Sequence, residues 1–277
     1  MDTGYLECLF GLSGKVAVVT GGGGVLCGTM APALARVGAK VAVLDLIPEA
    51  AQRVVDQIAA AGGEAIAMKC DVLDKESIEA AAKIVMDEYG AVDILINGAG
   101  GNKKEATTTP DFTFFDLPAD AIQWVFNLNC LGTILPSQVF GRVMAKKKEG
   151  VILNIASVNA FLPLTRIPAY SGAKAAVANF TQWLAVHMAQ EYSSRIRVNA
   201  VAPGFYLTHQ NRFLLTDEQT GDLTPRGRTI IQNTPMNRFG DPEELLGTVL
   251  WLLSPASEFV TGALVPVDGG FCAFSGV

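Results

Sequence analysis

Two side chains four residues apart, Tyr170 and Lys174, carry the strongest chemical signal in the sequence. Residues at this spacing share one face of a helix. A tyrosine, with an ordinary pKa of about 10, is a weak acid or base near neutral pH, and a neighbouring ammonium is expected to lower that pKa. Ser157 precedes Tyr170 by thirteen residues, and its hydroxyl can bind a carbonyl oxygen. The group predicts proton transfer to the oxygen of an alcohol/ketone pair.

A glycine run, Thr20–Gly24, follows a short apolar stretch and precedes a helical pattern. Such a turn lets the backbone approach a pyrophosphate, which lies against the N–H groups at the helix start. Asp45 ends the next apolar stretch, where a carboxylate can bind both adenosine ribose hydroxyls and repel a 2′-phosphate. We therefore predict NAD(H) rather than NADP(H) as the cofactor. The alternative is that Asp45 only caps the helix that begins at Pro48.

Small and polar residues after the third and fourth apolar stretches extend this cofactor edge. Asp71 and Val72 can reach the adenine, and the run Asn97–Gly100 can pack against the adenosine ribose. The residues predicted from these turns to bind the cofactor are Gly21, Gly23, Gly24, Val25, Leu26, Asp45, Leu46, Asp71, Val72, Asn97, Gly98, Ala99 and Gly100.

Seven short apolar runs alternate with longer helical patterns. Near-continuous hydrophobicity suits strands that are buried on both faces, and strand–helix alternation predicts right-handed βαβ units. We expect an α/β fold: a single doubly wound Rossmann domain over residues 1–277, with a seven-stranded parallel sheet flanked by helices. The strands are expected at Lys15–Thr20, Lys40–Asp45, Glu64–Cys70, Val92–Asn97, Gly150–Ala156, Arg195–Val201 and Ala263–Val267. The helices are expected at Leu26–Val37, Pro48–Ala61, Asp74–Tyr89, Pro118–Lys146, Ala169–Tyr192 and Pro242–Leu253.

Two polar stretches, residues 101–117 and 204–240, interrupt this alternation after the fourth and sixth strands. Ligands of open α/β sheets bind beyond the carboxyl ends of the strands, and long loops there are commonly functional. We predict that both are substrate loops, with a surface insertion as the alternative.

The amino-acid composition restricts the kinds of partner that the protein is expected to bind. Half of the 277 residues are hydrophobic and only 17% are charged, which excludes a disordered chain. A net charge of −6 disfavours nucleic acid and anionic membranes as partners. No apolar run is long enough for a membrane span, and the N-terminus lacks the basic start of a signal peptide. Five scattered cysteines and two histidines suggest neither disulfides nor a metal site. We expect a cytoplasmic protein with a small-molecule substrate.

Taken in order, these motifs resemble the short-chain dehydrogenase/reductase family over residues 12–270. The motifs that carry the resemblance are Asn97-Gly98-Ala99-Gly100, Asn129 with Gly132, Ser157, Tyr170 with Lys174, Pro203-Gly204 with Thr208, and Asp268-Gly269-Gly270.

The resemblance implies a role for each catalytic residue. Tyr170 is the general acid/base, Lys174 holds the nicotinamide ribose and lowers the pKa of Tyr170, and Ser157 orients the substrate oxygen. Asn129 anchors a proton-relay water. Members of the family usually form tetramers through the two long helices and the C-terminal segment, so a homotetramer is expected. The cofactor residues that the resemblance adds are Tyr170, Lys174, Pro203, Gly204, Phe205 and Thr208.

The glycine loop departs from the family pattern T-G-x-x-x-G-x-G. Val25 and Cys27 replace its second and third glycines, and Gly28 falls one position late. Side chains at these positions can crowd the pyrophosphate. Pro32, inside the following helix pattern, predicts a kink or a late helix start.

A narrower resemblance is to the branch of D-mannonate oxidoreductases, or fructuronate reductases, which interconvert D-fructuronate and D-mannonate with NAD(H). Its residues are Thr20–Gly28, Ile96–Asn102, Phe126–Gly132, Asn159–Lys174 and Pro266–Val277. A substrate of this kind, a keto sugar acid, needs a cation and polar donors. The predicted substrate-binding residues are Asn102, Ser157, Asn159, Arg166, Tyr170 and His209.

Other interpretations stay open. Lys103 and Lys104 follow the nucleotide edge, where a solvated charge pair is the simpler interpretation. Arg166 either binds a substrate carboxylate or is an ordinary surface cation. The whole chain suits another sugar, polyol or sugar-acid dehydrogenase, such as one similar to gluconate 5-dehydrogenase. A non-catalytic NADH-sensing protein is the alternative from another class.

Overall fold

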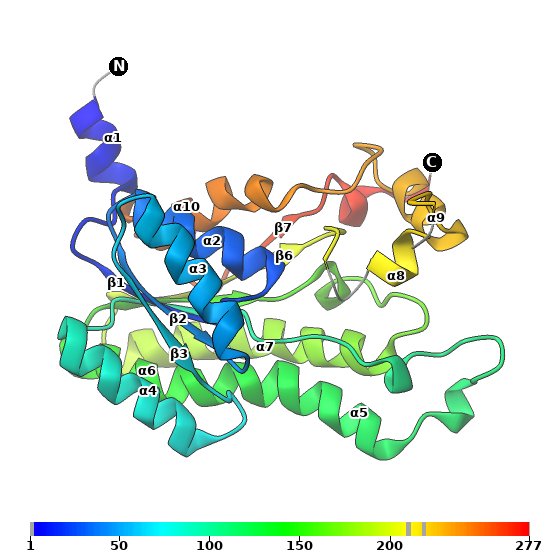
Figure 1. Cartoon of the computed structure of the whole chain (residues 1–277), viewed down its shortest axis with the longest axis horizontal. Coiled ribbons are helices and arrows are strands. Elements are labelled where there is room, and N and C mark those ends of the chain that lie inside the picture. Colours follow the sequence, from blue (N-terminus) through cyan, green and yellow to red (C-terminus); the bar gives the residue numbers. More distant parts are fainter. Residues whose placement is uncertain (1–2, 209–211, 218–219, 277) are drawn as a thin grey trace.

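A seven-stranded parallel sheet organises the molecule (Figure 1), in the strand order β3-β2-β1-β4-β5-β6-β7. The computed structural model describes residues 3–208, 212–217 and 220–276. Because the strand order runs outward in both directions from β1, the sheet is doubly wound, and the predicted fold class is confirmed. The strands are β1 Val16–Thr20, β2 Lys40–Asp45, β3 Ala65–Lys69, β4 Ile94–Asn97, β5 Gly150–Ile155, β6 Ile196–Pro203 and β7 Leu264–Val267. Each strand end lies within two residues of its predicted position.

Helices cover both faces of the sheet because alternate residues of each strand point to opposite sides. Ala17 and Val19 of β1 are buried with α2, α3 and α10, whereas Val16 and Val18 are buried with α4, α6 and α7. Figure 1 shows these two helical layers above and below the sheet. The helices are α1 Thr3–Phe10, α2 Val25–Arg36, α3 Pro48–Ala60, α4 Lys75–Tyr89, α5 Ala119–Phe126, α6 Gly132–Lys147, α7 Pro168–Glu191, α8 Arg212–Leu215, α9 Pro225–Gln232 and α10 Leu246–Leu253.

The predicted helix Pro118–Lys146 is not continuous. A π-helical turn, η3 (Asn127–Leu131), separates α5 from α6. A π turn inserts an extra residue into the α-helical repeat, and hydrophobic periodicity does not reveal such a local insertion. The predicted helix at Pro242 likewise begins as a 3₁₀ turn, Pro242–Leu245, before α10.

The N-terminal helix α1 was not predicted. None of its residues is buried, so it lacks the apolar face that packs against a core and that signals a helix in sequence. Pro32 does not delay α2, which begins at Val25. Within the part of the chain that the structure describes, no helix combines the length and apolarity that a membrane span requires.

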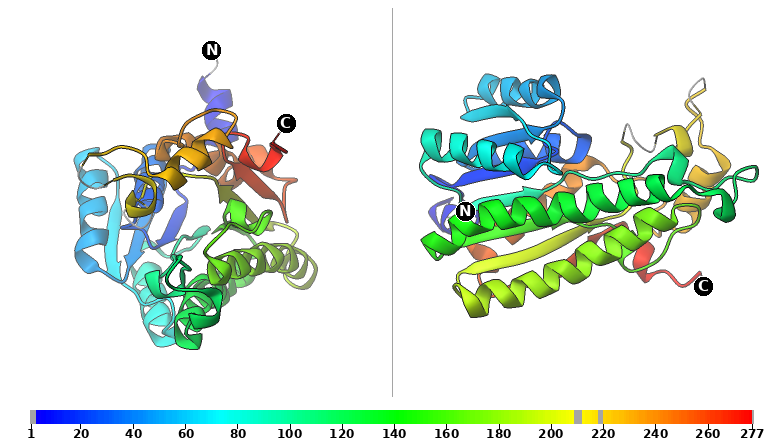
Figure 2. Two further views of the ribbon diagram at one scale, coloured as in Figure 1. Left: turned by 90° about the vertical axis from the view of Figure 1, so that its right-hand side faces the viewer. Right: turned by 90° about the horizontal axis from the view of Figure 1, so that it is seen from below.

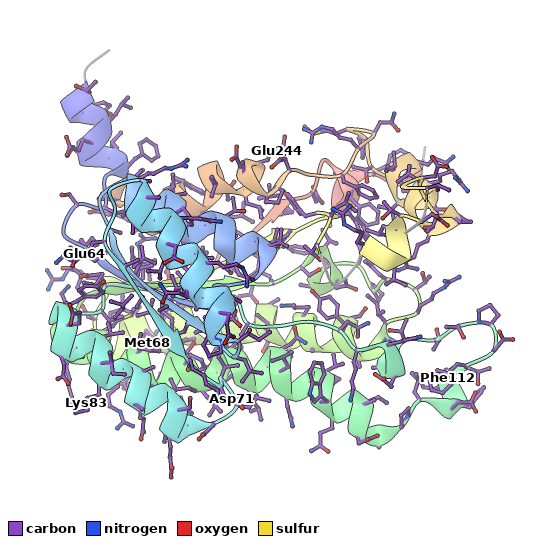
Figure 3. The ribbon with its side chains drawn as sticks, in the orientation of Figure 1. Glu64, Met68, Asp71, Lys83, Phe112 and Glu244 are labelled. Carbon is purple, nitrogen blue, oxygen red and sulfur yellow. The ribbon has the colours of Figure 1, made fainter. Side chains whose placement is uncertain are left out.

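Both polar stretches contain short elements. Residues 101–117 include the 3₁₀ turns Lys104–Ala106 and Phe114–Asp116, with Phe112 near the projecting tip (Figure 3). Residues 204–240 include α8 and α9. Figure 2 shows the described parts of the two segments at the same end of the molecule. They follow β4 and β6, so they stand beyond the carboxyl edge of the sheet.

Candidate active site

The end of β5 and the start of α7 bring three of the predicted catalytic side chains together. Pro168 occupies the first position of α7, where its missing N–H is tolerated, and Tyr170 and Lys174 follow on one face. The Tyr170 hydroxyl is hydrogen-bonded to Ser157. The Lys174 Nζ lies 5.6 Å from the centroid of the Tyr170 ring and donates to the carbonyl oxygen of Ile155 at 2.7 Å. A hydroxyl, a phenol and an amine therefore meet within one small site.

In this structure burial, rather than the charge of Lys174, sets the direction of the Tyr170 pKa shift, and the predicted effect of Lys174 stays a prediction. Burial raises the pKa of Tyr170 to about 12, and the hydrogen bond with Ser157 offsets only part of that rise. Burial also lowers the pKa of Lys174 to about 8. Desolvation disfavours the charged form of both groups. At neutral pH the phenol is protonated, which suits donation of a proton to a developing alkoxide.

Asn129 lies in the π turn between α5 and α6 and is fully buried. Its amide Nδ2 donates to the carbonyl oxygens of Gly101 at 2.7 Å and Val125 at 2.8 Å, and its Oδ1 accepts from the N–H of Gly101 at 3.2 Å. A Cβ added at Gly100 would lie 2.7 Å from Asn129 Oδ1 and 3.3 Å from Lys174 Nζ. Asn129 and Lys174 therefore flank the same backbone segment after β4, and the π turn supplies the geometry.

The side-chain amide of Asn159 positions the Ser157 hydroxyl through a hydrogen bond. Its Nδ2 donates to Ser157 Oγ at 3.3 Å, and its Oδ1 accepts from Ser171 Oγ at 2.7 Å and from the N–H of Leu164 at 3.3 Å. The residue is 5% exposed. The amide is largely engaged inside the protein, and its predicted role in binding a substrate hydroxyl stays a prediction. Ser171, which the sequence did not single out, belongs to this support.

The first βα turn has the features of a pyrophosphate cradle. Gly21 has φ +61°, and a Cβ there would lie 2.8 Å from the backbone of Ala99. α2 begins at Val25 with Gly24 as its N-cap, and no side chain caps its first turn. The N–H groups of Val25 and Leu26 thus stand at the positive end of a 12-residue helix. The residues present fit a dinucleotide phosphate.

Asp45 links this turn to the end of β2. Its Oδ2 accepts from the N–H of Gly23 at 2.9 Å, and its Oδ1 accepts from the N–H of Ile47 at 3.0 Å. Ile47 is the N-cap of α3, so Asp45 also holds the backbone at the start of that helix, without capping the N–H groups of its first turn. Two hydrogen bonds leave lone pairs of the carboxylate available for ribose hydroxyls. Leu46, next to it, is exposed.

The substituted glycine loop accommodates Cys27 by burying it. The side chain is 3% exposed, and a Cβ at Gly98 would collide with its Sγ. Cys27 therefore fills the space that Gly98 leaves empty, and burial raises the pKa of its thiol to about 12. A buried thiol does not crowd a ligand at the surface of the turn. Val25, at the helix start, is half-buried.

The segment after β4 is held by hydrogen bonds that the sequence did not reveal. The N–H groups of Gly98 and Ala99 donate to Thr20 Oγ1 at 3.1 and 3.4 Å. Asn97 Nδ2 donates to Asn154 Oδ1 at 2.8 Å and to Ser137 Oγ at 2.9 Å. Asn154 was detectable as a polar residue inside an otherwise apolar strand, and Thr20 as the residue before the glycine run.

The remaining predicted cofactor residues extend along the same edge. Asp71 follows β3 (Figure 3) and accepts from the N–H of Leu73 at 2.9 Å, and Val72 is buried beside it. At the other end, Pro203 closes β6, and the N–H of Gly204 donates to Val267 at 3.0 Å. Phe205 packs edge-on against Phe271 at 5.1 Å, and Thr208 follows three residues later. The predicted cofactor residues therefore lie along the carboxyl edge of the sheet, from β3 to β6.

The predicted substrate residues differ in their surroundings. Asn102 donates to Thr107 Oγ1 at 2.8 Å, whereas its Oδ1 is buried without a protein partner in the described structure. Lys103 lies 5.4 Å from the centre of the Trp124 ring, so it is not simply one of a solvated pair. Arg166 is exposed on the loop before α7. His209 lies outside the described residues.

Among the described residues, no three His, Cys, Asp or Glu side chains gather closely enough to hold a metal ion.

One cavity of about 210 Å³ lies between α3 and β3, lined by residues such as Gln52 and Met68. Another of about 400 Å³ lies at the amino edge of the sheet near Lys15 and Arg197. Neither includes Tyr170 or Ser157.

Sequence and structure comparisons agree with this geometry. The profile of a family described as enoyl-(acyl carrier protein) reductase, in the short-chain alcohol dehydrogenase group, matches residues 26–272. The uncharacterised oxidoreductase UxuB of Bacillus subtilis is 51% identical over 275 residues, which cover 96% of this chain and 98% of the relative.

Two crystal structures are similar over nearly their whole length. A candidate D-mannonate oxidoreductase of Haemophilus influenzae with bound NAD superposes with a TM-score of 0.92 and 49% identity, covering 98% of this chain and 100% of that one. A gluconate 5-dehydrogenase of Burkholderia cenocepacia, in complex with NADP and tartrate, has a TM-score of 0.85 and 30% identity, with coverages of 97% and 99%.

Proposed function

The chain belongs to the short-chain dehydrogenase/reductase family of oxidoreductases that act on CH–OH groups, and from this premise we propose that it interconverts D-fructuronate and D-mannonate with NAD(H). The observation that carries the proposal is the cluster of Ser157, Tyr170 and Lys174 at the carboxyl edge, in a chain 49% identical to a candidate D-mannonate oxidoreductase.

In the proposed reaction the bound nicotinamide supplies the hydride that reduces the ketone carbon. Ser157 donates a hydrogen bond to the substrate oxygen, and the phenol of Tyr170 delivers its proton to that oxygen as it becomes an alkoxide. Lys174 would hold the nicotinamide ribose, and its positive charge stabilises the phenolate left at Tyr170 until the phenolate takes a proton from water. Oxidation of the alcohol runs through the same groups in reverse. Asn129 holds the backbone of Gly101 in place beside them.

NAD(H) is proposed over NADP(H) because the Asp45 carboxylate stands at the end of β2. A negative charge there accepts hydrogen bonds from ribose hydroxyls and repels a 2′-phosphate. The structural relative from Haemophilus influenzae contains NAD, whereas the gluconate 5-dehydrogenase from Burkholderia cenocepacia contains NADP. The second candidate function, a gluconate 5-dehydrogenase-like activity, is favoured by that second similarity.

The deciding experiment follows NADH oxidation at 340 nm with purified protein. D-fructuronate, 5-ketogluconate and uncharged ketoses are offered in parallel. Rapid oxidation with fructuronate alone is expected. Activity on 5-ketogluconate in its place would support the second candidate, and NADH binding without turnover of any ketone would support a sensor role. The Tyr170→Phe variant serves as the control for background oxidation.

We also propose that the protein is a cytoplasmic homotetramer. The outer surface of α7 supports the assembly, because Trp183 is 57% exposed and Val186 is 56% exposed on the same helix. Contiguous exposed apolar side chains on one helix face commonly mark a protein–protein interface. Light scattering coupled to size exclusion measures the mass directly, and a monomer of 29.3 kDa would contradict the assembly.

A further inference from the structure

Arg226, on the first turn of α9, reaches back to the loop that precedes the catalytic helix. Its Nη1 donates to Thr165 Oγ1 at 3.1 Å, and its Nη2 donates to the Thr165 carbonyl oxygen at 3.3 Å. Thr165 is the chain neighbour of Arg166, and Tyr170 follows four residues after Arg166. The segment after β6 thereby places a second guanidinium beside the one that the sequence identified.

The backbone of Arg166 is held in an unusual conformation. Its φ is +75°, in the left-handed region that a bulky residue rarely adopts. The carbonyl oxygen of Arg166 accepts from the N–H of Thr108 at 2.8 Å, while the preceding carbonyl accepts from Arg226. Two consecutive carbonyls are thus held by the two polar segments, one after β4 and one after β6. Such strain persists where the surrounding contacts impose it, commonly at functional sites.

The two guanidiniums have no acidic partner in the described residues, since no carboxylate there lies within ion-pair distance of Arg166 or Arg226. Burial and then the charge of Arg166 lower the pKa of Arg226. Two neighbouring cations repel each other, and a bound anion removes that repulsion. Arg226 uses two of its five N–H donors on Thr165, so three are left.

We propose that Arg166 and Arg226 together bind the carboxylate of the substrate, and that Arg226 is a specificity-determining residue for acidic over uncharged ketoses. The inference rests on the proposed keto sugar acid reduction. A guanidinium matches a carboxylate through paired N–H donors. In a keto sugar acid the carboxylate lies several carbons from the ketone. A cation pair formed by Arg166 on the loop leading to Tyr170 and Arg226 on α9 can therefore hold one end of the substrate while Ser157 and Tyr170 hold the other.

The test compares Arg226→Gln and Arg226→Lys with the matched control Arg228→Gln. Arg228 is an exposed cation two residues along the same helix and donates to the carbonyl oxygen of Leu223. For Arg226→Gln we expect KM for D-fructuronate to rise roughly ten- to a hundred-fold, the range for loss of charge-assisted hydrogen bonds. KM for NADH stays near wild type. Arg226→Lys restores part of the affinity, and Arg228→Gln changes KM less than about two-fold.

Tartrate inhibition is measured on the same proteins with whichever ketone the wild type reduces, and Arg226→Gln is expected to weaken it by a similar factor. If fructuronate is not reduced, the proposed function fails, and tartrate inhibition still tests the cation pair. If fructuronate is reduced but Arg226→Gln and Arg228→Gln have equal KM and equal tartrate inhibition, the inference is overturned. Circular dichroism and NADH binding show whether Arg226→Gln is folded. If it is misfolded, Arg226→Lys is compared with Arg228→Gln instead.

Discussion

The side-chain amide of Asn129 binds the backbone of Gly101 at both of its polar groups, with Oδ1 accepting at 3.2 Å and Nδ2 donating at 2.7 Å. This pairing ties the π turn after α5 to the segment that leaves β4. Gly100, one residue earlier, lies in the narrow space between Asn129 and Lys174. The positions of Asn129 and Lys174 therefore depend on the close approach of the backbone at Gly100.

Gly100→Ala tests that approach. The added Cβ would lie 2.7 Å from Asn129 Oδ1, so the amide or the backbone must shift, at a cost of about 1–3 kcal/mol for overpacking. Turnover is expected to fall at least ten-fold. The matched control is Gly247→Ala in α10, where nothing lies within 4 Å of the new Cβ. That change is expected to stabilise the helix by roughly 0.5–1 kcal/mol. Thermal unfolding and steady-state kinetics measure both, and normal turnover in Gly100→Ala would contradict the tight packing.

Tyr170→Phe removes the proposed proton donor while keeping the ring. Turnover of the ketone is expected to fall roughly 10²–10⁴-fold, the usual contribution of a positioned acid. NADH binding, followed by fluorescence titration, should stay close to wild type, because the ring still packs in the same place. Near-normal turnover would rule out Tyr170 as the proton donor.

The pH dependence of ketone reduction follows from Lys174. Its pKa is lowered to about 8, so it carries its charge below that pH and loses it above. Tyr170, with a pKa raised to about 12, stays protonated throughout the accessible range. The value of kcat/KM should therefore be level below about pH 8 and fall above it. In Lys174→Arg, whose guanidinium stays charged, the residual activity should lose this descending limb. An unchanged limb would assign it to another group.

Asp45→Asn separates charge from hydrogen bonding at the end of β2. The amide oxygen can still accept from the N–H of Gly23, but the repulsion of a 2′-phosphate is gone. The ratio of kcat/KM for NADH to that for NADPH is expected to fall roughly ten-fold, since one charge in a partly exposed site contributes about 1 kcal/mol or more. Wild-type protein that uses NADPH as well as NADH would contradict the proposed preference.

Local patterns in the sequence were sufficient to predict the strands and to place Tyr170 and Lys174 on one helix face. A run such as Lys40–Asp45 is apolar enough to be buried on both faces, and the structure places β2 at those residues. Residues four apart share a helix face wherever the helix lies. The interrupted helix at Asn127–Leu131 was missed, because a π turn leaves no mark on hydrophobic periodicity.

Tertiary structure alone decided what surrounds those residues. The sequence determined that a tyrosine, a lysine and a serine belong to one site, but burial set the direction of both pKa shifts, and burial depends on the whole fold. Arg226 stands 60 residues from Arg166 in the chain, yet its hydrogen bonds to Thr165 bring the segments after β5 and β6 together. Contacts between distant segments and the loss of solvent around a side chain arise only when the sheet assembles, so no local pattern encodes them.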